Sequence, residues 1–244
     1  MNAWQAIVFD LDDTLYAERD YVLSGMRAVA DWARRAFDLP AERSCAELRS
    51  LVDAGARGNT FDRWLARHGI AAAEHVATMV EVYRSHRPTI ALQPAVEKLL
   101  QRLAARYRLG IVTDGYLAVQ RQKVAALGIE RRVHAIVYSD ALGRDAWKPD
   151  PRPFYEVLAQ LDVPAQRAVY VGDNPAKDFL GARRAGMASI RLRRTNGVYR
   201  HLEPSKSATA PDAEITSLDH LEATLSTMRN NALSLDSPLA KAAA

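Results

Sequence analysis

The chain contains five short apolar runs that each end in polar residues or glycine, at 6–9, 109–112, 135–138, 168–171 and 188–192. Runs of this length bounded by turn-forming residues are typical of buried strands in a parallel sheet. The sequence therefore predicts a sheet whose strands all end at a polar edge.

Segments with helical periodicity separate these runs. In the first of them Val96, Leu99 and Leu103 repeat on one stripe of a helix. The other helical segments in this part of the chain are 119–127, 153–161 and 177–185. Because strand and helix alternate, we predict an α/β domain with a doubly wound, Rossmann-like parallel sheet.

Residues 16–87 break that alternation because they show only helical periodicity, over 21–37, 44–54, 60–68 and 73–86. The pattern predicts a small all-helical domain over 16–87. The core domain is then formed by 1–15 together with 88–228. Residues 229–244 have little apolar surface to bury, and we predict a flexible tail there.

The composition fits a cytoplasmic protein of one or two compact domains. Apolar residues make up 48% of the 244 residues, which is enough for a sizeable core. The single cysteine, Cys45, excludes an intramolecular disulfide and fits a reducing compartment. No window reaches the roughly 20 apolar residues of a membrane span, and no signal peptide is recognised, so no membrane partner is expected.

The formal net charge of +4 comes from arginines spread along the whole chain. Nucleic-acid binders more often concentrate basic charge in one stripe with stacking aromatics, so we expect no nucleic-acid partner. A mild positive field suits an anionic small molecule such as a phosphate ester. We expect a monomer or a homodimer.

Aspartates stand directly after two of the predicted strands. Asp10 and Asp12 follow the first strand, and Asp173 and Asp178 follow the run 168–171. Ligands of open α/β sheets bind beyond the carboxyl ends of the strands, and carboxylates that meet there repel one another unless a cation joins them. A single aspartate in such a place is usually a helix cap or a turn former. The joint pattern instead predicts a Mg²⁺ site.

Two further segments have the residues for binding a phosphate. Thr113, Asp114 and Gly115 follow the second predicted strand, and Lys148 precedes a predicted helix. A hydroxyl and free backbone N–H groups at a strand-to-helix turn can hold phosphate oxygens, and a lysine adds positive charge. The alternative is that Thr113 caps a helix and that Lys148 is a solvated surface residue.

Together these segments resemble the four motifs of the haloacid dehalogenase (HAD) superfamily. The matching pieces, in order, are Asp10-Leu11-Asp12-Asp13-Thr14, Thr113-Asp114-Gly115, Lys148-Pro149 and Gly172-Asp173-Asn174-Pro175-Ala176-Lys177-Asp178. The helical segment between the first two motifs resembles the family's type 1 cap. The resemblance extends over roughly 1 to 225 and implies a phosphatase.

The resemblance also implies a role for each matching residue. Asp10 is expected to attack phosphorus and form an aspartyl-phosphate, with Asp12 as the general acid and then the general base. Thr113 and Lys148 are expected to assist catalysis and, with Asp114 and Gly115, to bind the phosphate.

The metal ligands implied are the Asp10 and Asp173 carboxylates and the backbone carbonyl of Asp12, around Mg²⁺. Asp178 is expected to orient Lys148 or a metal-bound water. Position 114 departs from the family pattern, which often has asparagine there. Because an ionised Asp114 only accepts hydrogen bonds, it is expected to face substrate hydroxyls or the cap domain, or to cap the next helix.

The substrate class stays open at this stage, between a sugar phosphate and a nucleoside monophosphate. In the predicted cap, Arg57 and Asn59 lie on a glycine-bearing loop and are candidates for substrate contacts, with Arg87 and Tyr116 as further candidates. A plain surface or interdomain role is the alternative for each. Three alternative functions remain on the same fold: a phosphotransferase or mutase, a 2-haloacid dehalogenase and a non-catalytic regulatory protein. Asp12 argues against the dehalogenase.

Overall fold

The computed structural model describes residues 4–235, which separate into two compact units. The first unit takes in the described residues of 1–17, 92–120 and 128–244. The second takes in 18–91 and 121–127. Helix α6 (Leu117–Leu127) begins in the first unit, and its last residues are grouped with the second.

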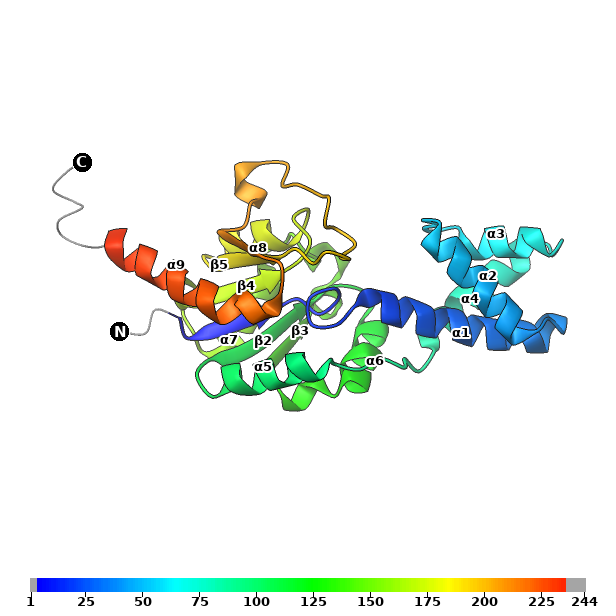
Figure 1. Ribbon diagram of the computed structural model, residues 1–244, viewed down its shortest axis with the longest axis horizontal. Coiled ribbons are helices and arrows are strands. Elements are labelled where there is room, and N and C mark those ends of the chain that lie inside the picture. The colour runs from blue at the N-terminus through cyan, green and yellow to red at the C-terminus, as the bar shows by residue number, and fades with distance from the viewer. Residues whose placement is uncertain (1–3, 236–244) are drawn as a thin grey trace. The chain divides into compact units, whose positions relative to one another are not determined.

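The first unit is built on a six-stranded sheet in which every neighbouring pair of strands is parallel. The strand order is β3-β2-β1-β4-β5-β6, so β1 is hydrogen-bonded on both sides (Figure 1). The strands are β1 (Ala6–Phe9), β2 (Arg108–Thr113), β3 (Ala135–Tyr138), β4 (Ala168–Gly172), β5 (Ala188–Leu192) and β6 (Ala213–Ile215). Because β1 lies between β2 and β4, residues after these three strands meet at one edge.

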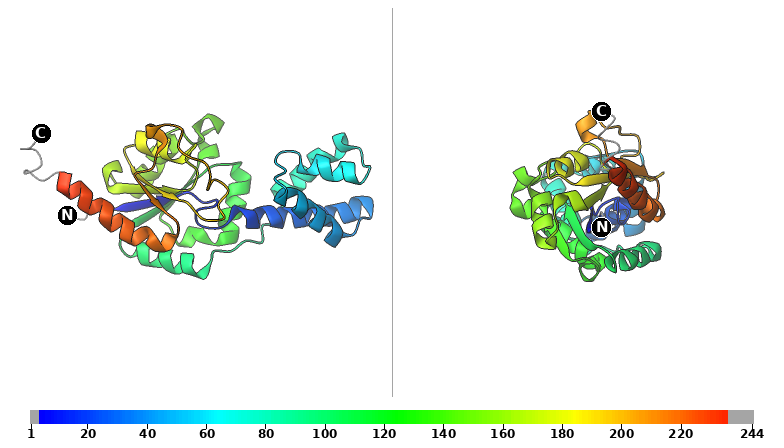
Figure 2. Two further views of the ribbon diagram at one scale, coloured as in Figure 1. Left: turned by 45° about the horizontal axis from the view of Figure 1, so that its top comes forward. Right: turned by 90° about the vertical axis from the view of Figure 1, so that its left-hand side faces the viewer.

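Helices cover both faces of this sheet, as Figure 2 shows end-on. Helices α7 (Arg152–Leu161) and α8 (Asp178–Arg184) pack on one face, and α5 (Pro94–Ala104) and α9 (Leu221–Leu235) lie on the other. Alternate residues of a strand point to opposite faces, so Val8 joins the core under α7 and α8. Single 3₁₀ turns lie at Ile129–Arg131, Ser139–Leu142, Arg144–Ala146, Ala165–Arg167, Ser207–Thr209 and Leu218–His220.

This architecture confirms the predicted doubly wound α/β core. Strand β6 was not predicted, because it has three residues with no apolar run and Glu214 at its centre is exposed. The predicted flexible tail from residue 229 begins inside α9, which continues to Leu235 in a segment without glycine or proline. The rest of that predicted tail lies outside the described residues.

The second unit contains four helices and the end of α6. The helices are α1 (Glu18–Phe37), α2 (Ala41–Asp53), α3 (Thr60–Arg67) and α4 (Ala72–Ser85). Their apolar stripes enclose a core that includes Met26, Leu48, Trp64 and Met79. Trp64 is fully buried, and its indole N–H donates to Glu47 at 3.1 Å, which satisfies the one polar group of the ring.

Across residues 4–235, none of the helices combines the length and the apolar character needed to span a bilayer.

Candidate active site

The carboxylates after β1 and β4 meet at the carboxyl edge of the sheet. Asp10 follows β1 directly, Asp173 follows β4, and Asp178 begins α8. One carboxylate oxygen from each of the three lies within 4.8 Å of the others, and all three residues are buried. The strand order thus brings together residues that are more than 160 positions apart in the sequence.

Lys148 lies in the middle of these acids. Its ammonium donates to Asp10 at 2.7 Å, to Asp178 at 2.8 Å and to the Tyr170 hydroxyl at 2.9 Å. Its side chain is fully buried. The Tyr170 hydroxyl in turn donates to Asp178 at 3.2 Å, so the lysine is fixed by a closed network of charge-assisted hydrogen bonds.

Burial and mutual repulsion raise the pKa values of two of these acids. Burial is the main cause that raises the pKa of Asp10 to about 7, helped by Asp178 and opposed by Lys148 and Lys177. Burial and the charges of Asp178 and Asp10 raise the pKa of Asp173 to about 9. Groups with pKa values displaced in this way by burial and by specific neighbours are typical of functional sites.

Asp178 is the acid of the cluster that stays ionised. Burial alone would raise its pKa, but Lys148, Lys177 and two hydrogen bonds outweigh that cost and lower it. One of these bonds comes from the Asn174 backbone N–H, at 2.8 Å. Its two oxygens are therefore occupied by the protein, Oδ1 by Lys148 and Tyr170 and Oδ2 by Asn174.

The donor set fits Mg²⁺. Oxygen ligands from carboxylates suit this ion, and Asp10 and Asp173 supply them side by side. Asp173 Oδ2 is buried and has no hydrogen-bond partner in the described part of the chain. Since a buried carboxylate oxygen without a partner is costly, a cation at this oxygen would remove that cost.

Asp12 stands at the same edge but is held by different neighbours. Its carboxylate accepts hydrogen bonds from the Tyr16 hydroxyl and, at 3.1 Å, from the Gln120 amide. The Gln120 amide also donates to the Asp114 carbonyl, and Gly115 makes room for it. Gly115 has a φ of 126°, and a Cβ there would lie 2.6 Å from Gln120 Nε2.

Thr113 ends β2 beside these groups. Its hydroxyl is buried and is not hydrogen-bonded to any residue that the structure describes. Buried hydroxyls are normally paired, so an unpaired one at a strand end is suited to a ligand oxygen. The Asp114 carboxylate is already engaged, because it accepts from the Lys148 backbone N–H at 3.2 Å and lies 3.5 Å from Lys177 Nζ.

Asp114 does not cap the next helix. The first N–H of α6, on Leu117, instead donates to Asp140 at 2.9 Å. Asp140 lies on the 3₁₀ turn after β3, and its other oxygen accepts from the Trp147 indole at 3.0 Å. One aspartate from the neighbouring strand end therefore does the capping, and of the uses expected for Asp114 the helix cap is wrong.

A segment after β5 buttresses the loop that follows β1. The Arg194 guanidinium donates to the Thr14 carbonyl at 2.6 Å, and the Val198 backbone N–H donates to Asp13 at 3.4 Å. Asp13 has a φ of 52°, in the left-handed region that aspartate tolerates better than most residues. These contacts fix the turn that carries Asp12.

Several residues of this site were missed from the sequence. They lie in segments whose sequence pattern gives no sign of a functional role, and they are Lys177, Tyr170, Gln120, Tyr16 and Arg194. Lys177 had one available signal, since it lies inside the fourth motif between Asp173 and Asp178. For Gln120 and Tyr170, only the packing of α6 and the pairing of β4 with β1 reveal the contact.

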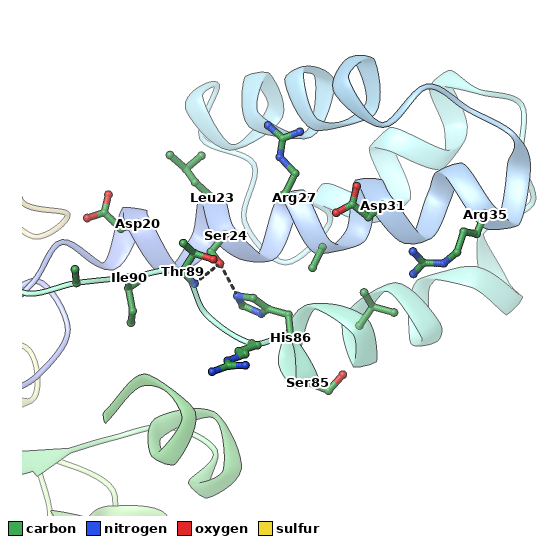
Figure 3. A pocket seen from close by; sticks show the side chains of 14 residues that line it. Asp20, Leu23, Ser24, Arg27, Asp31, Arg35, Ser85, His86, Thr89 and Ile90 are labelled. Carbon is green, nitrogen blue, oxygen red and sulfur yellow. Dashed lines mark hydrogen bonds between the residues drawn. The ribbon is translucent and has the colours of Figure 1, made fainter. Parts of the chain in front are cut away.

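The loop with Arg57 and Asn59 belongs to the second unit, and its role in binding substrate stays a prediction. That unit has a cavity of its own, of about 920 Å³, between α1 and the segment after α4 (Figure 3). Arg87 lines this cavity, whereas Arg57 and Asn59 do not. At its wall the Ser24 hydroxyl meets His86 at 3.1 Å and accepts from the Thr89 N–H at 2.8 Å.

Sequence comparison gives a family and several relatives. A family model described as haloacid dehalogenase-like hydrolase matches residues 7–192. A glyceraldehyde 3-phosphate phosphatase from Methanopyrus kandleri is 35% identical over 221 residues, which are 86% of this chain and 92% of the relative. A phosphoglycolate phosphatase from Rhodospirillum rubrum is 31% identical over 76% of this chain and 78% of its own length.

Solved structures share the fold. A 2-haloacid dehalogenase from Pseudomonas syringae superposes with a TM-score of 0.62 and is 27% identical, covering 92% of this chain and 99% of the other.

Proposed function

The chain belongs to the haloacid dehalogenase-like hydrolases, and we propose that it is a Mg²⁺-dependent phosphatase that hydrolyses a small phosphate monoester through an aspartyl-phosphate on Asp10. One observation carries the proposal. The buried Asp10 carboxylate, 2.7 Å from Lys148, shares its edge of the sheet with Asp173 and with Asp12, an acid held by two donors. The residues proposed as nucleophile, proton carrier and metal ligands are thus gathered at one edge.

In the proposed reaction, an Asp10 oxygen attacks phosphorus and the bond from phosphorus to the ester oxygen breaks. Asp12 gives a proton to the departing alcohol and then accepts one from the water that hydrolyses the aspartyl-phosphate. Lys148 favours the ionised form of Asp10, because it lowers the pKa that burial raises. Asp178 orients Lys148 through the bond at 2.8 Å.

Mg²⁺ would be held by the Asp10 and Asp173 carboxylates and the Asp12 backbone carbonyl. When bound, it would supply positive charge that screens the anionic nucleophile from the anionic ester. Thr113 and the backbone N–H groups of Asp114 and Gly115 would receive phosphate oxygens.

The substrate class follows from the named activities of the relatives. Glyceraldehyde 3-phosphate and phosphoglycolate are small phosphorylated metabolites, and we propose a substrate of that class. Sugar phosphates and nucleoside monophosphates belong in the test panel.

The proposal includes a cytoplasmic location, which the single cysteine Cys45 favours, and a monomeric or homodimeric state without nucleic-acid or membrane partners.

Dehalogenation is the competing reaction, because one structural neighbour is a 2-haloacid dehalogenase. Displacement of a halide from carbon releases an anion that needs no proton. An acid held in place by Tyr16 and Gln120 is therefore of use to a phosphatase rather than to a dehalogenase. Transfer of the phosphoryl group to a second substrate, as in a mutase, uses the same Asp10 intermediate, while a non-catalytic protein would show no turnover.

The test measures phosphate release from triose phosphates, phosphoglycolate, sugar phosphates and nucleotides, with Mg²⁺ and with EDTA, and halide release from 2-chloropropionate. We expect Mg²⁺-dependent phosphate release that Asp10→Asn abolishes while the far-ultraviolet circular dichroism is unchanged. Halide release without phosphate release would overturn the proposal, and so would full activity of Asp10→Asn.

A further inference from the structure

Lys148 has no hydrogen-bond donor left for a substrate. An ammonium group carries three N–H donors. Its nitrogen lies within 2.9 Å of Asp10, Asp178 and the Tyr170 hydroxyl, which gives each donor its own acceptor inside the protein. The side chain is fully buried. To contact a phosphate, Lys148 would have to give up one of these three bonds.

Lys177 is the second lysine of the site, and its situation is different. It lies on the turn after β4, and its ammonium reaches Asp114, which follows β2, at 3.5 Å. Because β1 lies between β2 and β4, this ion pair crosses the carboxyl end of the strand that carries Asp10. The Lys177 side chain is 35% exposed, so solvent and small ligands can reach part of it.

Only Asp114 of the Asp114–Lys177 pair is fixed by other contacts. Asp114 is fixed, since it is buried and its other oxygen accepts from the Lys148 backbone N–H. Lys177 has no further ion-pair partner within 4.0 Å in residues 4–235. It therefore keeps donors available while Asp114 prevents it from swinging into solvent.

Thr113 supplies a second unpaired group next to this pair. It immediately precedes Asp114, and its buried hydroxyl has no partner in the described chain. A hydroxyl that can donate and an ammonium with free donors are both groups that bind phosphoryl oxygens.

We infer that Lys177, held by Asp114, binds the oxygens of the transferred phosphoryl group. This inference rests on the proposed phosphatase activity. It gives a reason for aspartate rather than asparagine at position 114. An amide there would remove the ion-pair partner that holds Lys177 in place.

The test compares Lys177→Met and Lys177→Arg with the wild type and with Lys98→Met, a matched change at an exposed residue of α5. Isothermal titration calorimetry in Mg²⁺ buffer measures the Kd of inorganic phosphate, and steady-state kinetics measure KM and kcat. Loss of a charge-assisted hydrogen bond to phosphate corresponds to about a tenfold or greater loss of affinity. We expect this loss in Lys177→Met, a partial recovery in Lys177→Arg and wild-type values in Lys98→Met.

Each other outcome is informative. Wild-type phosphate affinity in Lys177→Met, with only a lower melting temperature, would overturn the inference and leave a structural ion pair. A loss confined to phosphoglycolate, absent for glyceraldehyde 3-phosphate and inorganic phosphate, would also overturn it, because Lys177 would then bind the distal carboxylate. If the wild type hydrolyses no ester but binds phosphate through Lys177, the proposed function fails and the binding role stands.

Discussion

The Gln120 amide lies 3.1 Å from Asp12 Oδ2, so a residue of helix α6 holds the carboxylate that is proposed to carry the proton. Tyr16 holds the other oxygen of the same carboxylate. Both residues act on the proposed reaction through Asp12, which makes Gln120 and Tyr16 positioning residues.

Replacing Gln120 with leucine is therefore expected to lower kcat more than it changes KM. Misplacing a proton carrier by a fraction of an ångström costs roughly ten- to a hundredfold in rate. Steady-state kinetics with an alkyl phosphate check this. The matched control is Gln160→Leu at an exposed position of α7. An unchanged kcat in Gln120→Leu would mean that Asp12 is oriented without it.

The affinity for Mg²⁺ is expected to rise with pH. Without the metal, burial and neighbouring charges raise the pKa of Asp10 to about 7 and that of Asp173 to about 9. Protons and Mg²⁺ compete for these carboxylates, so below pH 9 the ion must displace at least one proton. The apparent Kd should fall by about tenfold for each unit of pH between 7 and 9.

Isothermal titration of the metal-free protein at several pH values measures that slope. Asp173→Asn removes a ligand and should abolish binding in the same range. A Kd that does not change between pH 7 and 9 would show that these acids are already ionised before the metal binds, contrary to the expectation.

The second unit is expected to lose stability in mild acid because of His86. Burial is the main cause that lowers the pKa of His86, and Lys123 lowers it further, while the bond to the Tyr83 carbonyl opposes both. The unfolded imidazole has a pKa of about 6.5. The unfolded chain thus takes up the proton more readily, and stability that is present above that pH falls as the pH drops below it.

Urea unfolding of the wild type and of His86→Gln at pH 7.5 and 5.5 checks this. The decrease in unfolding free energy between the two pH values should be smaller in His86→Gln than in the wild type. His220→Gln, at an exposed position, serves as the control. Direct titration by NMR that places the His86 pKa above 6.5 would contradict the assignment.

Helix α1 touches α4 at Gly25 with no room for a methyl group. A Cβ on Gly25 would lie 2.4 Å from two ring carbons of Tyr83. Gly25→Ala should therefore destabilise the protein by about 1–3 kcal/mol, the range measured for overpacked cores. Thermal unfolding measures the effect. Gly55→Ala is not a suitable control, because Gly55 has a φ of 82° at which alanine is strained. A better control is Ser50→Ala on the exposed face of α2. An unchanged melting temperature in Gly25→Ala would show that the two helices separate without cost.

The sequence predicted the site best where an acidic residue comes at the end of a strand. Asp10 and Asp173 come at the ends of apolar runs, and the parallel sheet brings such ends to one edge whatever the details of packing. The short strand β6 escaped detection because three residues with an exposed glutamate carry no periodicity. The core was predictable from pattern because β1 and β4 are fully buried and therefore appear as continuous apolar runs.

Contacts that depend on side-chain reach were not predictable. Tyr170 looks like an ordinary buried strand residue until β4 is paired with β1 and its hydroxyl meets Lys148. The sequence allowed several uses for Asp114. In the structure Asp140 accepts the first N–H of α6, and Asp114 pairs with Lys177 instead. Such contacts depend on distances that no periodicity encodes.

Strand β1 lies inside the sheet, and its backbone hydrogen bonds should open rarely. All four residues of this strand are fully buried and are paired with β2 on one side and β4 on the other, and the Asp10 N–H donates to Val171 at 2.8 Å. Amides in such a strand exchange with deuterium only when the whole domain opens. The backbone that carries the nucleophile should therefore be among the last to exchange, while the loop at 193–200 should exchange earlier. The reactive carboxylate is thus attached to a backbone that opens rarely, while the segment that supports the Asp12 turn opens more often.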